Sequence, residues 1–208
     1  MARPLPSLSD LSLDSASTVL CRVDFNVPLQ GDEVADDTRI RRALPTLRAI
    51  LQTGARLVVC SHLGRPRGRR NESLSLLPAA ARLAELLEVD VVFAHDPCGT
   101  EVEQLVRELP EHGVMVLENL RFDPRETAGD DTMARDLAKL GTHFVLDAFG
   151  AMHRSHASVT GVPAHLPSAA GLLVHDEIQH LGALLGVVRS PFAAILGGSK
   201  VTDKIGVI

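Results

Sequence analysis

The sequence contains little of what several classes of protein require. Its apolar runs are much shorter than a membrane-spanning helix, which needs about 20 such residues. The formal net charge of −5 argues against a nucleic-acid binder whose whole surface is basic. Hydrophobic residues at 45% and charged residues at 23% instead describe a globular protein that buries a core. We expect neither a membrane nor a nucleic acid among its partners.

Cysteine is scarce, and no pair has the CxxC spacing of a redox or metal motif. Cys21, Cys60 and Cys98 are far apart, and the first two lie inside apolar runs. The beginning of the sequence also lacks the charged and then apolar pattern of a secretory signal. These absences predict reduced, mostly buried thiols and a cytoplasmic protein.

Apolar runs and helical segments alternate along the chain. Five runs rich in β-branched residues end abruptly in polar loops, over residues 19–26, 57–65, 89–94, 114–121 and 144–156. Helical spacing lies between them, at residues 38–52, 77–88, 101–109 and 131–140. This alternation predicts an α/β fold, with a doubly wound, Rossmann-like parallel sheet covered by helices on both faces in three layers.

Single residues refine the expected helices. Pro45 lies inside the apolar stripe of the helix at 38–52, so we expect a kink or a break there. Asp36, Asp37 and Thr38 are candidate N-caps of the same helix. Gly141 is the expected C-cap of the helix at 131–140.

The last third of the chain changes character. Residues 151–171 are rich in Ser, His, Pro and Gly, which indicates a long functional loop. A helix over 176–185 then precedes a strand at 192–196 and a GGSK segment. We expect a substrate-binding domain over 1–175, an interdomain helix and hinge over 176–190, and the truncated start of a second α/β domain over 191–208. The sequence stops about two turns into a helix, so we expect it to be a fragment.

Polar residues at the ends of the runs indicate a binding site. Loops that follow the carboxyl ends of parallel strands line one crevice, so residues far apart in sequence are expected to meet there. These residues are Asp24 and Asn26, His62 and Arg65, Arg121, and Arg154. Arginine binds phosphate with a bidentate fork, and histidine adds a further donor. The set predicts a pocket for a small anion, although each residue alone also fits a solvated or turn-forming position.

Other charged motifs have open or unspecific interpretations. Arg39 lies in the first turn of a helix, where the helix dipole disfavours a cation, so it is either functional or simply solvated. The run RPRGRR at 65–70 resembles a nucleic-acid patch, but without neighbouring aromatics a solvated loop is favoured. His153 and His156 have HxxH spacing without an accompanying acidic or cysteine ligand, which argues against a metal site.

The GGSK segment follows an expected strand and opens a helix. Gly197 and Gly198 let the backbone approach a phosphate, and Lys200 and Lys204 add positive charge. The spacing is not GxxxxGK[ST], so this is not a Walker A loop.

Taken together, these motifs resemble one enzyme family. The segments RVDFNVPL, DDTRIRRALPT, SHLGRP, LENLRF, DAFGAMHRSHAS and AILGGSKVTDKI occur in the order and at the spacings of phosphoglycerate kinases. The resemblance extends from about residue 18 to residue 208 and covers the amino-terminal half of that family only. Ala151 and Met152 stand where the family more often has Thr and Ala.

The resemblance implies a role for each residue. Asp24 and Asn26 would hold the hydroxyl end of 3-phosphoglycerate, and Arg39 would lie by the carboxylate that exchanges the phosphoryl group. The phosphate of the substrate would be bound by His62, Arg65, Arg121 and Arg154. Lys200 would lie near the transferring group, as a catalytic residue with Arg39. Gly197, Gly198, Lys200 and Lys204 would contact the nucleotide.

The implied reaction is reversible transfer from 1,3-bisphosphoglycerate to MgADP, giving 3-phosphoglycerate and MgATP. Mg²⁺ would come with ADP or ATP, its protein ligands lying outside this chain, and the parent protein would be monomeric. Two other functions stay open. A non-catalytic binding module for a small phosphorylated acid would need the pocket but not Lys200. A dinucleotide-dependent oxidoreductase would need GxGxxG after the first strand, which RVDFNVPLQG lacks.

Overall fold

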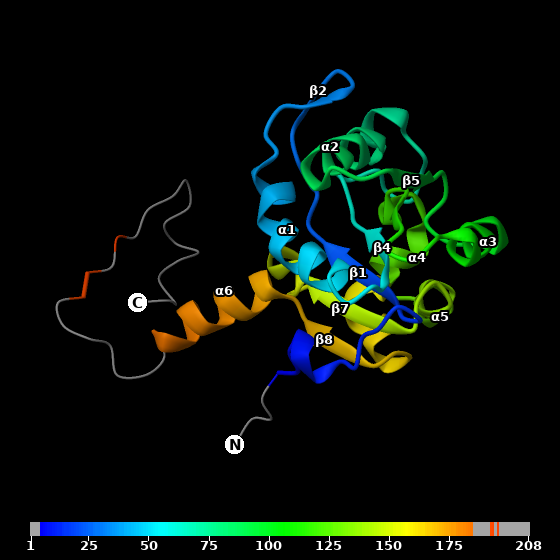
Figure 1. The fold of residues 1–208 in the computed structure, drawn as a ribbon. Helices are drawn as coiled ribbons and strands as arrows, with labels where there is room; N and C mark the ends of the chain where they lie inside the picture. The colour runs from blue at the N-terminus through cyan, green and yellow to red at the C-terminus, as the bar shows by residue number, and fades with distance from the viewer. Residues whose placement is uncertain (1–4, 185–191, 194, 196–208) are drawn as a thin grey trace. The chain divides into compact units, whose positions relative to one another are not determined.

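A computed structural model of the chain describes residues 5–184, 192, 193 and 195 (Figure 1). The strands are β1 (Thr18–Val23), β2 (Leu29–Gln30), β3 (Glu33–Val34), β4 (Arg56–Cys60), β5 (Val91–Ala94), β6 (Val114–Leu117), β7 (His143–Asp147) and β8 (Ser168–Ala170). The α-helices are α1 (Thr38–Leu51), α2 (Leu77–Leu87), α3 (Thr100–Glu108), α4 (Pro124–Ala128), α5 (Asp131–Ala138) and α6 (Leu172–Ala183). Short helices are η1 (Leu8–Asp10), η2 (Glu72–Leu74), η3 (Leu120–Phe122), η4 (Phe149–Ala151), η5 (Ala157–Gly161) and η6 (Val162–Ala164).

Six strands form one parallel sheet in the order β5-β6-β4-β1-β7-β8. The chain first extends the sheet on one side of β1, through β4, and later on the other side, through β7. The order therefore reverses at β1, and the loops after β1 and β7 flank the point where such sheets bind ligands. The parallel α/β fold expected from the alternating pattern is confirmed.

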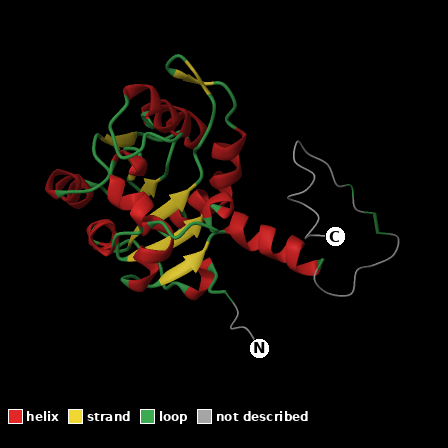
Figure 2. Ribbon diagram, turned by 180° about the vertical axis from the view of Figure 1, so that it is seen from behind, coloured by secondary structure: helices red, strands yellow, loops and turns green. Residues whose placement is uncertain are grey.

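Helices cover both faces of the sheet (Figure 2). Val19, Cys21 and Val23 of β1 pack with α1 and α2 in one buried cluster, and Leu20 packs with α3 and α5 in another. Because alternate side chains of a strand point to opposite faces, a strand covered on both faces is apolar along most of its length. This explains why the expected strands appear as continuous apolar runs rather than as alternating ones.

The break expected at Pro45 does not occur, and the kink expected as its alternative stays a prediction. α1 is one helix from Thr38 to Leu51 that contains Pro45. Proline removes only the hydrogen bond to Arg41 O, and the buried side chains of Leu44 and Leu47 hold both halves against the sheet. Of the candidate caps, Asp36 receives a hydrogen bond from Thr38 N at 2.8 Å, and Asp37 occupies the N-cap position without a side-chain cap bond.

Gly141 does not cap the helix at 131–140. α5 ends at Ala138 with Lys139 as its C-cap. A Cβ atom on Gly141 would lie 3.1 Å from Leu20 N and Thr18 O, so the close approach to the β1 backbone favours glycine at this position. In the sequence, a glycine near the end of a helix resembles a C-cap. In the structure, the reason for this glycine is its contact with another strand.

Residues 151–171 are more ordered than a long loop. They contain η5, η6 and β8, and β8 pairs in parallel with β7. The three small residues of β8 carry no β-branched or alternating pattern that would reveal a strand. The short helix α4 and the hairpin β2–β3 were also not expected.

The chain divides into two units, Met1–Glu177 and Ile178–Ile208. α6 begins four residues before the expected start at 176, and residue 185, its expected end, is not described. The domain boundaries at 175 and 190 stay predictions. Of the strand expected at 192–196, residues 192, 193 and 195 are described and none of these three lies in a strand, while the GGSK segment lies outside the described residues. Within the described part, none of the helices has both the length and the apolar character to span a membrane.

Candidate functional site

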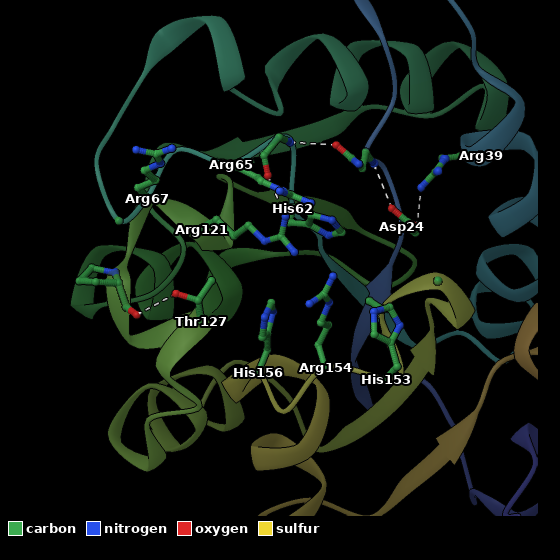
Figure 3. Close-up of a pocket in the computed structure, with 16 residues that line it drawn as sticks. Asp24, Arg39, His62, Arg65, Arg67, Arg121, Thr127, His153, Arg154 and His156 are labelled. Atoms are coloured by element: carbon green, nitrogen blue, oxygen red, sulfur yellow. Dashed lines mark hydrogen bonds and ion pairs between the residues drawn. The ribbon is translucent and has the colours of Figure 1, made fainter. Parts of the chain in front are cut away.

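One cavity of about 790 Å³ lies at the carboxyl ends of the parallel strands (Figure 3). The residues expected to bind the substrate all line it, namely Asp24, Asn26, Arg39, His62, Arg65, Arg121 and Arg154. They come from the loops after β1, β4, β6 and β7 and from the first turn of α1. The parallel sheet thus brings together residues that are far apart in the sequence, as the pattern of strand ends predicts. Their roles toward a ligand stay predictions at this point.

The loop after β1 presents Asp24 and Asn26 on the same side. β1 ends at Val23, and Phe25 between the two polar residues is fully buried, which directs its neighbours toward the cavity. Asp24 accepts a hydrogen bond from Asn26 N at 3.2 Å, and its other oxygen pairs with Arg39 at 2.5 Å. The loop is therefore held by a hydrogen bond within it and by an ion pair with Arg39 of α1.

Ser61 connects the loops after β1 and β4. Its buried hydroxyl donates to Val23 O and accepts from Phe25 N, both at 2.8 Å. Asn26 adds a second connection by accepting from Gly64 N at 2.8 Å. The sequence offers Ser61 no partner that would make it a nucleophile. In the structure its hydroxyl acts as a brace, that is, it links the ends of strands β1 and β4 by hydrogen bonds.

Gly64 forms the turn that carries His62 and Arg65. Its φ of +61° lies in the left-handed region that glycine adopts at low cost, and an added Cβ would lie 2.7 Å from Leu74 Cδ2. Arg121 donates from Nη1 to Gly64 O at 2.7 Å, so the turn also fixes one cavity arginine.

Glu118 and Asn119 hold the loop after β6 from beneath. Both are fully buried. Asn119 donates to Leu63 O and Leu74 O and accepts from Arg121 N. Glu118 accepts from Leu76 N at 2.9 Å and from Asn119 N at 2.7 Å. A buried polar network is favourable only when its members are paired, and here the paired side chains tie the β4 and β6 loops together.

The cavity carries a large excess of positive charge. Five guanidinium groups line it, those of Arg39, Arg65, Arg67, Arg121 and Arg154, against the single carboxylate of Asp24. Within residues 5–184, 192, 193 and 195, only Arg39 of these five forms an ion pair. Arg121 also has a buried Nε with no hydrogen-bond partner in the described part of the chain. Unpaired guanidinium groups around one cavity suit a multiply charged anion.

His62 enters the cavity as a neutral donor. Burial, together with the charges of Arg22 and Arg121, lowers the pKa of His62 to about 2. Its Nδ1 lies 3.0 Å from Nη2 of Arg22. A guanidinium can only donate, so Nδ1 accepts and the ring proton resides on Nε2.

Three further basic side chains line the cavity that the sequence did not assign to it, those of Arg67, His153 and His156. The run at 65–70 was expected to be a solvated loop, and Arg67 is indeed exposed, but Gly68 turns the loop at a φ of +72° so that Arg67 also borders the cavity. In Figure 3, Arg67 lies at the opposite end of the cavity from Asp24 and Arg39. No group of three or more His, Cys, Asp or Glu in the described residues is placed to hold a metal ion.

Arg22 is the most important residue that sequence reasoning missed. It is fully buried inside β1 and contacts His62, yet it does not line the cavity. The available signal was a charged residue in the middle of an apolar run, VLCRV, where an unpaired charge is costly. Gly197, Gly198, Lys200 and Lys204 lie outside the described residues, so their placement stays a prediction.

Comparisons with known proteins agree on one family. A family model described as phosphoglycerate kinase matches residues 8–208. The phosphoglycerate kinase of Thermomicrobium roseum is 53% identical over 190 residues, covering 91% of this chain and 48% of that protein. That of Chlorobium phaeovibrioides is 49% identical over 204 residues, covering 97% and 51% respectively.

Solved structures show the same similarity. The phosphoglycerate kinase of Coxiella burnetii matches with a TM-score of 0.85 at 34% identity, over 97% of this chain and 50% of that one. The enzyme of Pyrococcus horikoshii matches with a TM-score of 0.88 at 31% identity, over 98% and 51%. The chain spans about half the length of the relatives it matches.

Proposed function

The chain belongs to the phosphoglycerate kinase family, and from that premise we propose that its cavity binds 3-phosphoglycerate and 1,3-bisphosphoglycerate. The parent reaction would be reversible phosphoryl transfer from 1,3-bisphosphoglycerate to MgADP, giving 3-phosphoglycerate and MgATP, in the cytoplasm and by a monomeric enzyme. The observation that carries the proposal is the set of five guanidinium groups that surround one cavity with a single carboxylate.

The substrate would lie along the cavity in one direction. His62, Arg65, Arg121 and Arg154 would bind the phosphate that is not transferred, and the unpartnered Nε of Arg121 supports this end as the anion site. The Asp24 carboxylate would accept a hydrogen bond from the hydroxyl group of the substrate, and the Asn26 side chain would donate a hydrogen bond to it. Arg39 would lie by the carboxylate that exchanges the phosphoryl group, because the Asp24 carboxylate holds it at that end.

The residue types suit this chemistry. A carboxylate attacks phosphorus as an anion, so no proton has to be removed and no general base is needed. Catalysis would then consist of positioning the reactants and neutralising charge on the moving group, with Arg39 and Lys200 as the catalytic cations. His62 fits this scheme because its Nδ1 is occupied by Arg22 and its ring is neutral, so it binds rather than transfers protons.

The nucleotide would be bound by the segment that opens with Gly197 and Gly198. Lys200 would approach the transferring group and Lys204 the nucleotide phosphates. Magnesium would arrive with ADP or ATP as part of the substrate, and no step is assigned to a protein-bound metal ion. We propose that the 208 residues alone bind 3-phosphoglycerate but turn over negligibly, since little of a nucleotide site lies within them.

Calorimetric titration with 3-phosphoglycerate tests the proposal. Arg65→Ala should weaken binding roughly tenfold to a hundredfold, because a hydrogen bond to a charged group is worth about 1.5–3 kcal/mol. Arg69→Ala is the matched control, since this exposed arginine of the same loop does not line the cavity. Equal losses in both variants, or heat from NAD in place of 3-phosphoglycerate, would count against the proposal. A coupled assay showing normal ATP formation by these 208 residues would refute the claim of negligible turnover.

A further inference from the structure

A buried chain of hydrogen bonds runs beneath the cavity from Glu126 to His62. Glu126 of α4 and Arg22 of β1 are both fully buried. Ser158 of η5 lies between them, with its Oγ 2.6 Å from Glu126 Oε1 and 2.9 Å from Arg22 Nε. Arg22 then reaches His62 Nδ1 at 3.0 Å. Four segments distant in sequence thus contribute one residue each.

The two ends of this chain determine its direction. An ionised carboxylate only accepts hydrogen bonds and a guanidinium only donates them. Ser158 must therefore donate its hydroxyl proton to Glu126 and accept from Arg22. Arg22 must donate to His62 Nδ1, which leaves Nε2 as the protonated nitrogen of the ring. No other arrangement of the protons satisfies the same set of contacts.

Charge also favours an ionised Glu126. Burial raises the pKa of Glu126, but the interactions with His156 and Ser158 and the charge of Arg22 outweigh it, so the pKa stays below its usual value. Glu126 Oε2 further accepts from Ser158 N at 2.9 Å. The carboxylate compensates the buried guanidinium, which would otherwise be strongly destabilising.

The charged and titratable groups with the largest effect on His62 oppose a positive charge on its ring, although Asp24 lines the same cavity. They are Arg22 on β1, Arg39 on α1, Arg121 after β6 and His156 before η5. Neutral imidazole exists in two tautomers, and only one of them leaves Nε2–H free for a ligand while Nδ1 accepts from Arg22. The ring is a useful donor only if something selects that tautomer.

We propose that Arg22 is a positioning residue that holds His62 directly as the uncharged Nε2–H tautomer, with this N–H available to the anion, and that Glu126 orients Arg22 through Ser158. The identity of the anion as a phosphate rests on the proposed function, whereas the state of the ring does not. The consequence is a cavity donor that stays the same across the neutral pH range. A network that served stability alone would have no effect on the tautomer.

Nitrogen-15 NMR of the histidine rings tests the proposal directly on the 208-residue chain, with His62→Gln to assign the signal. Between about pH 5.5 and 8, His62 should show one tautomer, protonated at Nε2, with no titration. A ring protonated at Nδ1, or one that titrates near its ordinary pKa of about 6.5, would overturn the proposal.

The informative variant is Arg22→Met combined with Glu126→Gln, which removes both buried charges together. Both tautomers should then appear, and 3-phosphoglycerate should bind at least about twofold more weakly at pH 8, since the competent ring is present about half the time. Ser158→Ala keeps both charges. It should change the tautomer ratio of His62 and the affinity for 3-phosphoglycerate in the same direction as the double variant, but by a smaller amount. If the tautomer is unchanged in whichever of these variants folds, the network does not position His62.

Arg56→Met is the matched control. Arg56 is a partly buried arginine at the amino end of β4, the end away from the cavity, and it donates a hydrogen bond to Leu109 O at 2.8 Å. Its replacement should leave both the tautomer and the affinity unchanged. Loss of the single tautomer in this variant too would contradict a specific role for Arg22. If the ring state is as proposed but 3-phosphoglycerate does not bind, the proposed function fails while the positioning role stands.

Discussion

Acidification should destabilise the protein through His62 in particular. In the folded chain burial and the charges of Arg22 and Arg121 hold the pKa of this ring at about 2, whereas the ordinary value is 6.5. Below pH 6.5 the unfolded chain therefore binds a proton that the folded chain does not. Because the unfolded state gains that proton, stability is lost as the pH falls from about 6.5 toward 2, and it is unaffected by His62 above about pH 7.5.

The size of the effect follows from the same two pKa values. Each pH unit between them changes the free energy of unfolding by about 1.4 kcal/mol, so His62 should cost about 2 kcal/mol at about pH 5 relative to neutral pH. His62→Gln is the reference, since its amide oxygen can still accept from Arg22 but its side chain does not titrate. The other histidines are present in both proteins and cancel in the comparison.

Urea unfolding at several pH values from about 5 to 8 measures this difference. The wild-type chain should lose about 2 kcal/mol more than His62→Gln over that range, and the two curves should be parallel above about pH 7. Parallel curves over the whole range would refute the reasoning, because they would show that His62 binds its proton equally well in the folded state.

Three further outcomes follow from local contacts. Ser61→Ala leaves Phe25 N without its partner and removes one of the two donors to Val23 O, so it should cost about 1–3 kcal/mol in urea unfolding. Ser168→Ala, at the sheet edge, should cost less, and equal costs would argue against the role of Ser61 as a brace. Gly141→Ala should cost about 1–3 kcal/mol, because its Cβ meets the β1 backbone at 3.1 Å. Gly182→Ala, with nothing within 4 Å, should be neutral or stabilising, and a tolerated Gly141→Ala would contradict the close approach. Burial raises the pKa of Cys60 to about 12 and raises that of Cys21 as well, so mass spectrometry should find both unmodified after iodoacetamide treatment of the native chain at about pH 8; labelling as fast as in urea would show that these thiols are accessible.

The parallel sheet and most of the cavity could be predicted because their signals are local. A strand buried on both faces is apolar along most of its length, and a parallel sheet gathers the residues after its strands at one edge. These two rules suffice to group His62, Arg121 and Arg154 from the order of residues along the chain. Asp24 and Arg65 follow in the same way, because each lies in a loop that ends a strand.

The features that could not be predicted depend on partners far along the chain. Arg22 is separated from Ser158 by 136 residues, and nothing around VLCRV reveals that a serine and a glutamate will meet it. Gly141 has the sequence position of a helix cap, but a glycine is favoured there because the backbone of β1 passes close to it. Pro45 has the signature of a helix break, which the packing of α1 against the sheet overrides. Local pattern thus indicates the elements, while buried charge and close approach appear only once the elements are packed.

A crystal structure of the chain with 3-phosphoglycerate tests the central claim most directly. The phosphate should lie within hydrogen-bond distance of Arg65, Arg121 and Arg154, with the carboxylate toward Arg39. An empty cavity at saturating ligand, or a phosphate bound beside Arg39 and Asp24 instead, would contradict the proposed direction of the substrate and the division of work among these residues.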